Sequence, residues 1–290
     1  MTALLQYIVG GLAAGSLYAL AALGLTLIYK TTGVINFANG EMAMVSTFAA
    51  FILLTAYGLP YPLAFLGALL FAAALGIALE RLFLRPVRQS SHLNQIMVTL
   101  GLFMVLNGIA GTRFFEPLPF PKPVGGEPFD LLGIFVARDS LLVFGVAAAL
   151  VLALYLFFNH TLAGVALRAT AQNLDAARLM GVPIGQVYAA TWAVAAVLGA
   201  VAGMLIAPTT ALDPNFMGEV AIKAFAAAIL GGLGNLPGAI AGGLLLGVLE
   251  NLIAGYVSTE LKAVFAFAVI LFVLVVRPGG LMAAPVRRRV

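Results

Sequence analysis

The sequence predicts an all-α polytopic membrane protein with eight or nine transmembrane elements, some of them short or broken. Hydrophobic residues make up 63% of the 290 residues and charged residues only 9%, whereas soluble domains carry about 25% charged residues. A soluble fold of this length could not hide so much apolar surface from water. Several stretches also reach the roughly 20 apolar residues that a spanning helix needs.

Nine apolar segments follow one another along the chain. The first is longer than the roughly 7–15 apolar residues of a cleaved signal peptide, so we expect a retained first span. The second, seventh and eighth are short, and we expect half-helices or crossings completed by polar flanks. The segments are Leu4–Tyr29, Met42–Tyr57, Tyr61–Leu79, Ile96–Gly111, Leu141–Phe158, Val187–Ala207, Val220–Leu233, Ala239–Gly255 and Ala263–Val276.

Basic residues gather in connections that alternate to one side of the predicted spans. Since Lys and Arg favour the cytoplasmic side, we expect nine spans, an outer (periplasmic) N-terminus and a cytoplasmic C-terminus. A re-entrant element in place of one span would change the N-terminal side. The basic residues on the cytoplasmic side are Lys30, Arg81, Arg85, Arg88, Arg168, Arg178, Arg277, Arg287, Arg288 and Arg289.

Two polar, glycine-containing stretches interrupt the apolar sequence, at Thr31–Thr47 and Asp213–Lys223. Both contain Asn-Phe followed closely by Gly-Glu, and a Leu-Pro turn follows each. The topology gives them opposite directions, which predicts an inverted repeat, and broken helices at matching positions of such repeats often line the substrate path of transporters. The candidates for a path or its gate are Asn36, Phe37, Asn39, Glu41, Asn215, Phe216 and Glu219.

An ionised side chain near the bilayer centre costs roughly 2.5–3.5 kcal/mol, so the acidic candidates need partners. Glu219 and Lys223 are spaced i,i+4 in the favourable order, which predicts an intramembrane ion pair. Glu41 has no basic residue within a helical turn. It either caps a helix N-terminus or belongs to the path, and both interpretations stay open.

A third informative stretch lies in the predicted cytoplasmic loop, at Asn173–Gly185. Asn173 or Asp175 can begin a short helix, and Gly181 with Pro183 ends it. Ala176, Ala177 and Met180 would form a small apolar face, with Arg178 among them. The segment is either an ordinary amphipathic surface helix or a protrusion that fits a groove on a cytoplasmic partner.

Four glycine pairs at four-residue spacing predict closely packed helices in lipid: Gly11/Gly15, Gly199/Gly203, Gly238/Gly242 and Gly243/Gly247. The residues that metal, phosphate-loop and catalytic-triad sites need are scarce or missing. The chain has no cysteine, two histidines and no G-x-x-x-x-G-K-[ST] phosphate loop, so we expect no metal, no bound cofactor and no catalytic triad. The modest net charge of +4 does not indicate nucleic-acid binding.

Four motifs together resemble the permeases of branched-chain amino-acid ATP-binding-cassette importers, specifically the H-type subunit, over nearly the whole chain. The resemblance implies a single permease domain, residues 1–290, in the bacterial inner membrane, with a cytoplasmic coupling loop at residues 159–186. It also implies a second, M-type permease, two cytoplasmic ATPases that use ATP, and a periplasmic binding protein. The motifs are GVINFANGE (Gly33–Glu41), RATAQNLDAARLMGVP (Arg168–Pro183), DPNFMGEVAIKAFAAAILGGLGNLPGAIAGG (Asp213–Gly243) and RPGGL (Arg277–Leu281).

The resemblance favours ATPase docking for the short loop helix, because the family's Ala-Ala-x-x-x-Gly core matches this loop. Asn39 stands where many members have histidine. The substrate stays open between branched-chain amino acids and the urea, short-chain amides or aromatic acids of similar permeases. An ion-coupled transporter or channel acting alone is the rival class, and a membrane-embedded enzyme has little support. The implied coupling residues are Asn173, Asp175, Ala176, Ala177, Arg178 and Gly181.

Overall fold

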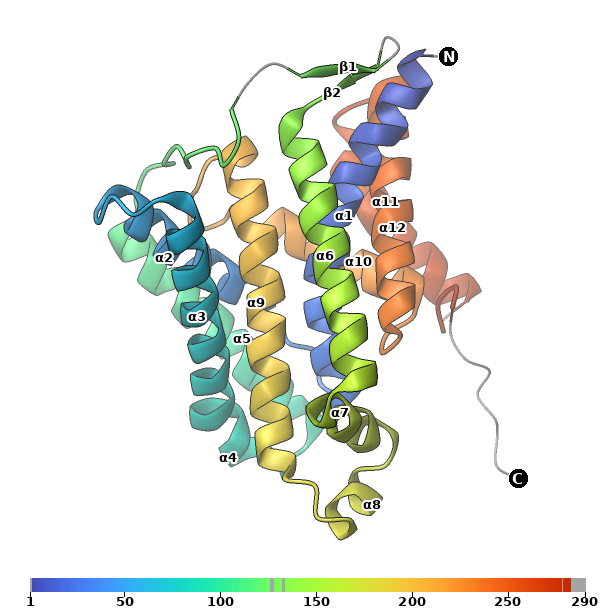
Figure 1. Ribbon diagram of the computed structural model, residues 1–290. Coiled ribbons are helices and arrows are strands. Elements are labelled where there is room, and N and C mark those ends of the chain that lie inside the picture. The colour runs from blue at the N-terminus through green and yellow to red at the C-terminus, as the bar shows by residue number, and fades with distance from the viewer. Residues whose placement is uncertain (1, 126–127, 132–133, 278, 283–290) are drawn as a thin grey trace.

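The computed structural model describes residues 2–125, 128–131, 134–277 and 279–282, and it shows a helical bundle (Figure 1). The longer helices are α1 (Thr2–Thr32), α2 (Asn39–Thr55), α3 (Tyr61–Leu79), α5 (His92–Arg113), α6 (Arg138–His160), α9 (Ile184–Thr210), α10 (Gly218–Gly231), α11 (Leu236–Tyr256) and α12 (Leu261–Val276). The shorter elements are the π-helical turn η1 (Glu80–Leu84), α4 (Arg85–Val87), α7 (Leu162–Gln172), α8 (Leu174–Leu179) and the antiparallel strands β1 (Phe129–Leu131) and β2 (Ile134–Val136).

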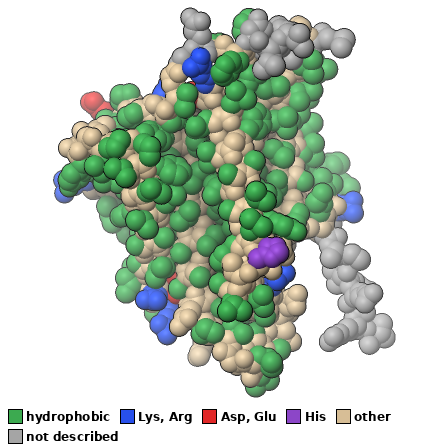
Figure 2. Space-filling view, viewed as in Figure 1, with side chains coloured by type: hydrophobic (Ala, Val, Ile, Leu, Met, Phe, Trp, Pro, Cys, Tyr) green, Lys and Arg blue, Asp and Glu red, His purple; other side chains and the backbone are tan. Residues whose placement is uncertain are grey.

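Each apolar segment expected from the sequence is a helix, which confirms the all-α polytopic fold. Six helical stretches of the described chain are long and apolar enough to cross a membrane, and α2 and α12 are shorter apolar helices. The count of eight or nine crossings therefore stays a prediction. Hydrophobic side chains cover most of the face in Figure 2, with few charged ones in its middle. The basic residues Arg287, Arg288 and Arg289 lie outside the described residues.

Six of the helices form two units of three, and the first helix of each unit packs against the other two helices of the opposite unit. The first unit is α1, α2 and α3, and the second is α9, α10 and α11. Helix α1 packs against α10 and α11 of the second unit, whereas α9 packs against α2 and α3 of the first. Helices α1 and α9 also contact each other and run in opposite directions (Figure 1). Outside them, α5 packs on α2 and α12 packs on α10, an arrangement that agrees with the predicted inverted repeat.

Glycine is what lets these helices approach so closely, as the four predicted pairs indicated. A Cβ built on Gly11 would lie 2.7 Å from Val248 Cα, and one on Gly15 would lie 2.8 Å from Leu244 Cα. The pair on α9 faces α2, where a Cβ on Gly199 would lie 3.1 Å from Ala43 Cβ. Such contacts hold helices together in lipid through van der Waals packing.

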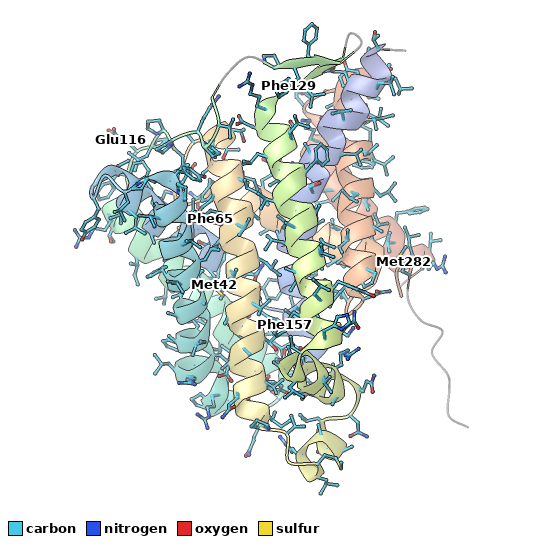
Figure 3. The ribbon with its side chains drawn as sticks, viewed as in Figure 1. Met42, Phe65, Glu116, Phe129, Phe157 and Met282 are labelled. Atoms are coloured by element: carbon cyan, nitrogen blue, oxygen red, sulfur yellow. The ribbon has the colours of Figure 1, made fainter. Side chains whose placement is uncertain are left out.

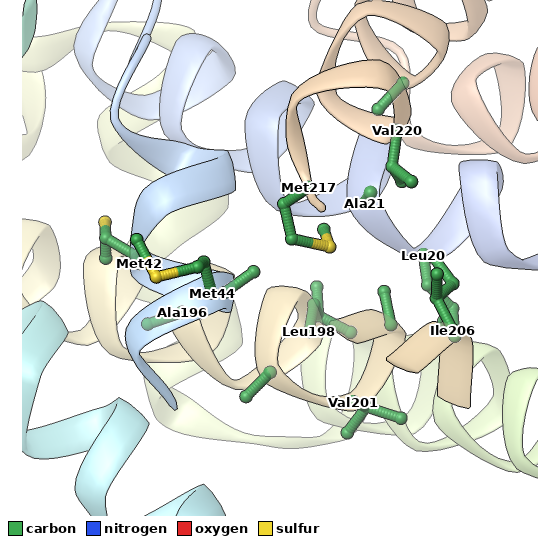
Figure 4. Packing of buried hydrophobic residues seen from close by; sticks show 14 of the residues in the cluster. Leu20, Ala21, Met42, Met44, Ala196, Leu198, Val201, Ile206, Met217 and Val220 are labelled. Atoms are coloured by element: carbon green, nitrogen blue, oxygen red, sulfur yellow. The ribbon is translucent and has the colours of Figure 1, made fainter. Parts of the chain in front are cut away.

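The centre of the bundle is formed where α1, α2, α9 and α10 meet. Met42 and Met44 of α2 lie over α9, and Met217 lies between α9 and α10 (Figure 4). All three are at most 2% exposed. The two chain breaks, between α1 and α2 and between α9 and α10, are thereby brought to the same central region.

Candidate functional site

The two breaks share one local design, in which a side-chain oxygen turns the backbone before each short helix. Asn36 Oδ1 accepts a hydrogen bond from the Ala38 amide at 3.0 Å, and Asp213 Oδ1 accepts one from the Asn215 amide at 2.7 Å. This side-chain-to-backbone turn is typical of Asn and Asp. Neither α2 nor α10 receives a side-chain cap at its first residue. The two short helices therefore begin with open N-termini near the centre of the bundle.

A cavity of about 540 Å³ lies between the breaks, within the roughly 300–1,000 Å³ typical of small-molecule sites. Its walls are mainly apolar and come from α1, the first break, α2, α5, α9, α10 and α12. The lining residues are Ala21, Leu25, Ile35, Asn36, Phe37, Asn39, Gly40, Glu41, Ala43, Leu100, Phe103, Gly199, Met217, Gly218, Ala221, Ile222, Ala224, Phe225, Phe267 and Ile270.

The first break supplies the cavity's polar residues, whereas the second supplies none of its predicted ones. Four of the seven candidates from the sequence, Asn36, Phe37, Asn39 and Glu41, line the cavity. The other three, Asn215, Phe216 and Glu219, are absent from the lining, and their neighbours Met217 and Gly218 take that place. Phe216 is buried in the core, while Asn215 and Glu219 are exposed. The two breaks thus contribute unequally, although their sequences resemble each other.

Asn107 of α5 joins the two breaks, and sequence reasoning missed it. Its Nδ2 lies 3.3 Å from Glu41 Oε2 in the first break. The same nitrogen lies 2.9 Å from the Pro214 carbonyl and 3.2 Å from Asn215 Oδ1 in the second. A polar side chain within an apolar segment is rare and often functional. Its position in Ile96–Gly111 was the signal that could have found it.

Glu41 is buried at the cavity edge, at 3% exposure. It lies in the first turn of α2, where the helix dipole favours a carboxylate. Among the described residues, Asn107 is the only side-chain hydrogen-bond partner of Glu41, and no ion pair joins Glu41 to a cation. Glu41 therefore lies in the first turn of α2 without capping its backbone, and it lines the cavity. A role in a substrate path stays a prediction.

Lys223 lies between two glutamates. Its Nζ is 2.6 Å from Glu219 Oε1, the partner that helical spacing predicts, and 2.8 Å from Glu250 Oε1 of α11. The Tyr18 hydroxyl of α1 lies 3.3 Å away. Glu250 is 4% exposed and Lys223 is 5% exposed, so the buried pair ties α10 to α11. Spacing along one helix could not reveal a partner on another.

The loop at residues 159–186 forms α7 and α8 and ends in a small protrusion at the end of the bundle opposite the N-terminus (Figure 1). Asn173 Oδ1 accepts a hydrogen bond from the Ala176 amide at 3.0 Å and so begins α8. Gly181 has φ +80°, the left-handed conformation that ends helices. Asp175 Oδ1 lies 3.6 Å from Arg178 Nη1 on the exposed surface.

The predicted apolar face of α8 is divided by the fold, which corrects one expectation. Ala177 points inward and is 4% exposed, while Ala176 and Met180 face outward. Because α8 has a buried side and an exposed side, Ala177 and Met180 cannot share one face. Leu179, which the prediction left out, is 89% exposed and Met180 is 83% exposed. The exposed apolar tip of the protrusion is therefore formed by Leu179 and Met180.

Ala177 connects the protrusion to the helices above it. It packs in a small apolar cluster with Tyr188 of α9. The Arg88 guanidinium carbon lies 4.3 Å from the Tyr188 ring centroid, and Arg88 also pairs with Glu80 of η1. Phe157, at the end of α6, packs against the same cluster (Figure 3). A displacement of α8 would thus move side chains that contact α6, α9 and the π-helical turn that follows α3.

Comparison with known proteins adds to this geometry. The family model described as "Branched-chain amino acid transport system / permease component" matches residues 7–274. The chain belongs to this permease family. It is 35% identical to the high-affinity branched-chain amino acid transport system permease protein LivH of Salmonella typhimurium, covering 97% of this chain and 96% of that protein. It is 34% identical to BraD of Pseudomonas aeruginosa over the same shares.

A more distant relative and one solved structure are also similar to this chain. A probable LivH of Methanocaldococcus jannaschii is 30% identical, with 95% of this chain and 89% of that protein covered. The fold is similar to that of a chain in the structure of PsaBC from Streptococcus pneumoniae in complex with Fab. The TM-score is 0.50 at 16% identity, covering 93% of this chain and 91% of that chain. At that identity the likeness concerns the fold alone.

No group of three or more His, Asp or Glu side chains that could hold a metal occurs among the described residues. The polar groups around the cavity are amides and one carboxylate. They can bind and orient a small molecule, but they contain no paired nucleophile and base.

Proposed function

We propose that this chain is the membrane-spanning subunit of an ATP-driven importer for branched-chain amino acids. The observation that carries the proposal is the similarity to branched-chain amino-acid permeases across 97% of the chain. The cavity between the two breaks agrees with it, because its apolar walls and few polar groups suit a small amino acid. The chain itself performs no covalent chemistry and binds no cofactor.

The working assembly contains this chain, a second permease of the M type, two cytoplasmic ATPases and a periplasmic binding protein. It lies in the bacterial inner membrane, with the C-terminus and α8 on the cytoplasmic side and the N-terminus on the periplasmic side. The position of α8 at the end opposite the N-terminus supports this orientation. The exposed Leu179 and Met180 are the apolar contacts that an ATPase groove would cover.

Transport proceeds by alternating access. ATP binding closes the ATPases, which push on α8, and Ala177 transmits that movement to Tyr188 and the helices around the cavity. The cavity then opens to one side of the membrane at a time. The breaks before α2 and α10 are the places where the bundle can bend, because no continuous helix crosses them.

The proposal is tested by uptake of labelled leucine into proteoliposomes that contain the assembled complex. We expect uptake that needs both ATP and the binding protein. The same chain reconstituted without ATPases should take up no leucine under a proton or sodium gradient. Ion-driven uptake by the chain alone would overturn the proposal and support an independent transporter. Uptake of urea or an aromatic acid in preference to leucine would reject branched-chain amino acids as the substrate.

A further inference from the structure

The cavity between the two breaks contains a carboxylate that has no cation. Three glutamates of the described chain are buried: Glu41, Glu80 and Glu250. Arg88 pairs with Glu80, and Lys223 pairs with Glu250. Glu41 has no such partner among the described residues, and of the three it is the one that lines the 540 Å³ cavity. Because a buried charge is costly unless it is paired, a cationic group in the cavity would stabilise the ionised form of this carboxylate.

A second unsatisfied acceptor lines the same cavity. Asn39 is 7% exposed, and its Oδ1 is buried without a hydrogen-bond partner. Its Nδ2 makes a long contact of 3.5 Å with the Ala21 carbonyl, so the amide oxygen is the free end. A buried acceptor left unpaired costs about as much as a lost hydrogen bond, and a donor on a ligand in the cavity would remove that cost.

The two acceptors select a particular ligand chemistry. An ammonium group carries three donors and no acceptor, and it can satisfy a carboxylate and an amide oxygen together. A carboxylate ligand would be repelled by Glu41. The remaining walls near these groups are apolar, with Leu25, Ile35 and Phe103 among them, and they provide no further charge.

An amino acid also carries a carboxylate, and the start of α10 offers a place for it. Helix N-termini carry partial positive charge. The Gly218 amide itself donates to the Asn215 carbonyl at 2.8 Å, so the positive end of the helix dipole is what would attract a carboxylate here. Helix α10 has 14 residues and no side-chain cap, and its first residue, Gly218, lines the cavity. A Cβ built on Gly218 would meet no atom within 4 Å. The start of α10 is therefore open to the cavity, unlike Gly40 at the start of α2, whose Cβ would lie 3.1 Å from Ala221.

We propose that Glu41 and Asn39 bind the ammonium group of the transported amino acid, with its carboxylate toward Gly218 and its aliphatic side chain against the apolar walls. This assignment rests on the proposed function, because it takes an amino acid as the substrate. It gives Glu41 a role beyond that of a helix-terminal residue. It also makes Asn107 a positioning residue, since its Nδ2 holds the Glu41 carboxylate at 3.3 Å.

The test measures binding of labelled leucine to the assembled complex in lipid nanodiscs, without the binding protein. Two competitors each lack one charged group: 3-methylbutylamine keeps the ammonium group, and 4-methylpentanoate keeps the carboxylate. In the wild type we expect the amine to displace leucine at concentrations at least tenfold lower than the acid. Glu41→Gln should weaken leucine binding at least tenfold and remove this preference, while Glu41→Asp, which retains the charge, should keep the preference.

Glu116→Gln is the matched control, because Glu116 is exposed in the loop after α5 (Figure 3) and does not line the cavity. It should bind leucine like the wild type. Wild-type-like binding by Glu41→Gln, equal displacement by both competitors, or no leucine retained by the wild type would each overturn the assignment. ATP-dependent leucine uptake, measured in parallel, separates this result from the proposed function. If the wild type takes up leucine and Glu41→Gln does not change leucine binding, the assignment alone is rejected. If the wild type takes up no leucine, the proposed function is rejected.

Discussion

Single side chains determine how the two breaks are held together, and Asn107 is the clearest case. Its Nδ2 contacts Glu41, Pro214 and Asn215, which come from both breaks. Asn107→Leu removes these hydrogen bonds and leaves the buried Glu41 carboxylate without this side-chain partner. We expect the free energy of unfolding to fall by about 1–3 kcal/mol, and leucine uptake to slow.

Thermal unfolding of the purified complex and uptake in proteoliposomes measure the two effects. Asn94→Leu is the control, because Asn94 is an exposed residue on the same helix. If Asn107→Leu matches this control in both measurements, Asn107 does not join the breaks.

Ala211 marks a strained point in the second break. Its φ of 65° and ψ of 157° fall in a region that glycine alone adopts freely, and such a conformation costs about 1–3 kcal/mol. Ala211→Gly relieves this strain but adds freedom to the unfolded chain. We expect a net gain of about 1 kcal/mol, seen as a raised thermal unfolding temperature. An unchanged or lower temperature would mean that Ala211 is unstrained.

At the scale of helices, the buried pair of Lys223 and Glu250 connects α10 to α11. Lys223→Met leaves a buried carboxylate without its cation, and breaking such a pair costs about 3–5 kcal/mol. The double variant Lys223→Met, Glu250→Leu should recover most of that stability, because an apolar pair can replace a buried ion pair.

Glu219→Gln should cost less than about 1 kcal/mol, since the Glu219 side chain is 63% exposed and exposed pairs contribute little. Chemical denaturation of the four proteins compares these values. A larger loss for Glu219→Gln than for Lys223→Met would show that the helical i,i+4 pair dominates.

The short helix α8 depends on Gly181, whose φ is +80°. Alanine is strained in this left-handed conformation by roughly 1–2 kcal/mol, so Gly181→Ala should loosen the end of α8. We expect substrate-stimulated ATPase activity of the complex to fall severalfold, while basal ATPase activity stays.

Gly145→Ala serves as the control, because Gly145 lies within α6 and a Cβ there meets nothing within 4 Å. Equal stimulation in the Gly181 and Gly145 variants would contradict a coupling role for α8.

The helices themselves could be predicted from the sequence, because each long apolar run has one way to satisfy its backbone in lipid. Tyr61–Leu79 coincides with α3 to the residue. The packing of α1 on the second unit and of α9 on the first could not be predicted from the sequence. The shared Asn-Phe and Gly-Glu pattern indicates that the two breaks are similar, but it does not show which helix surfaces touch. For the same reason Asn215 and Glu219 were predicted for the path or its gate, whereas Met217 and Gly218 line the cavity instead.

Side-chain partners on distant helices also could not be predicted from the sequence. Lys223 has a predictable neighbour at i−4, but Glu250 lies 27 residues away. Asn107 and Glu41 are separated by 66 residues. In a bundle, such pairs depend on helix rotation and depth, which hydropathy does not specify.

At the scale of the whole molecule, the two units meet at a cavity, and α8 lies at one end of the bundle. If the ATPases act through α8, the cavity should be reachable from one side of the membrane in one nucleotide state and closed to that side in another. The chain has no cysteine, so a single introduced thiol reports this directly. Ile222 suits the purpose, because it lines the cavity and is 37% exposed.

The most direct measurement is the rate at which Ile222→Cys, in the transport-active complex, reacts with a membrane-impermeant thiol reagent added from the binding-protein side. We expect at least a tenfold difference between the nucleotide-free complex and the complex arrested with ATP. Glu116→Cys, in the exposed loop, should react equally in both states. A rate at Ile222→Cys that is the same in both states would contradict an ATP-driven cavity between the two breaks.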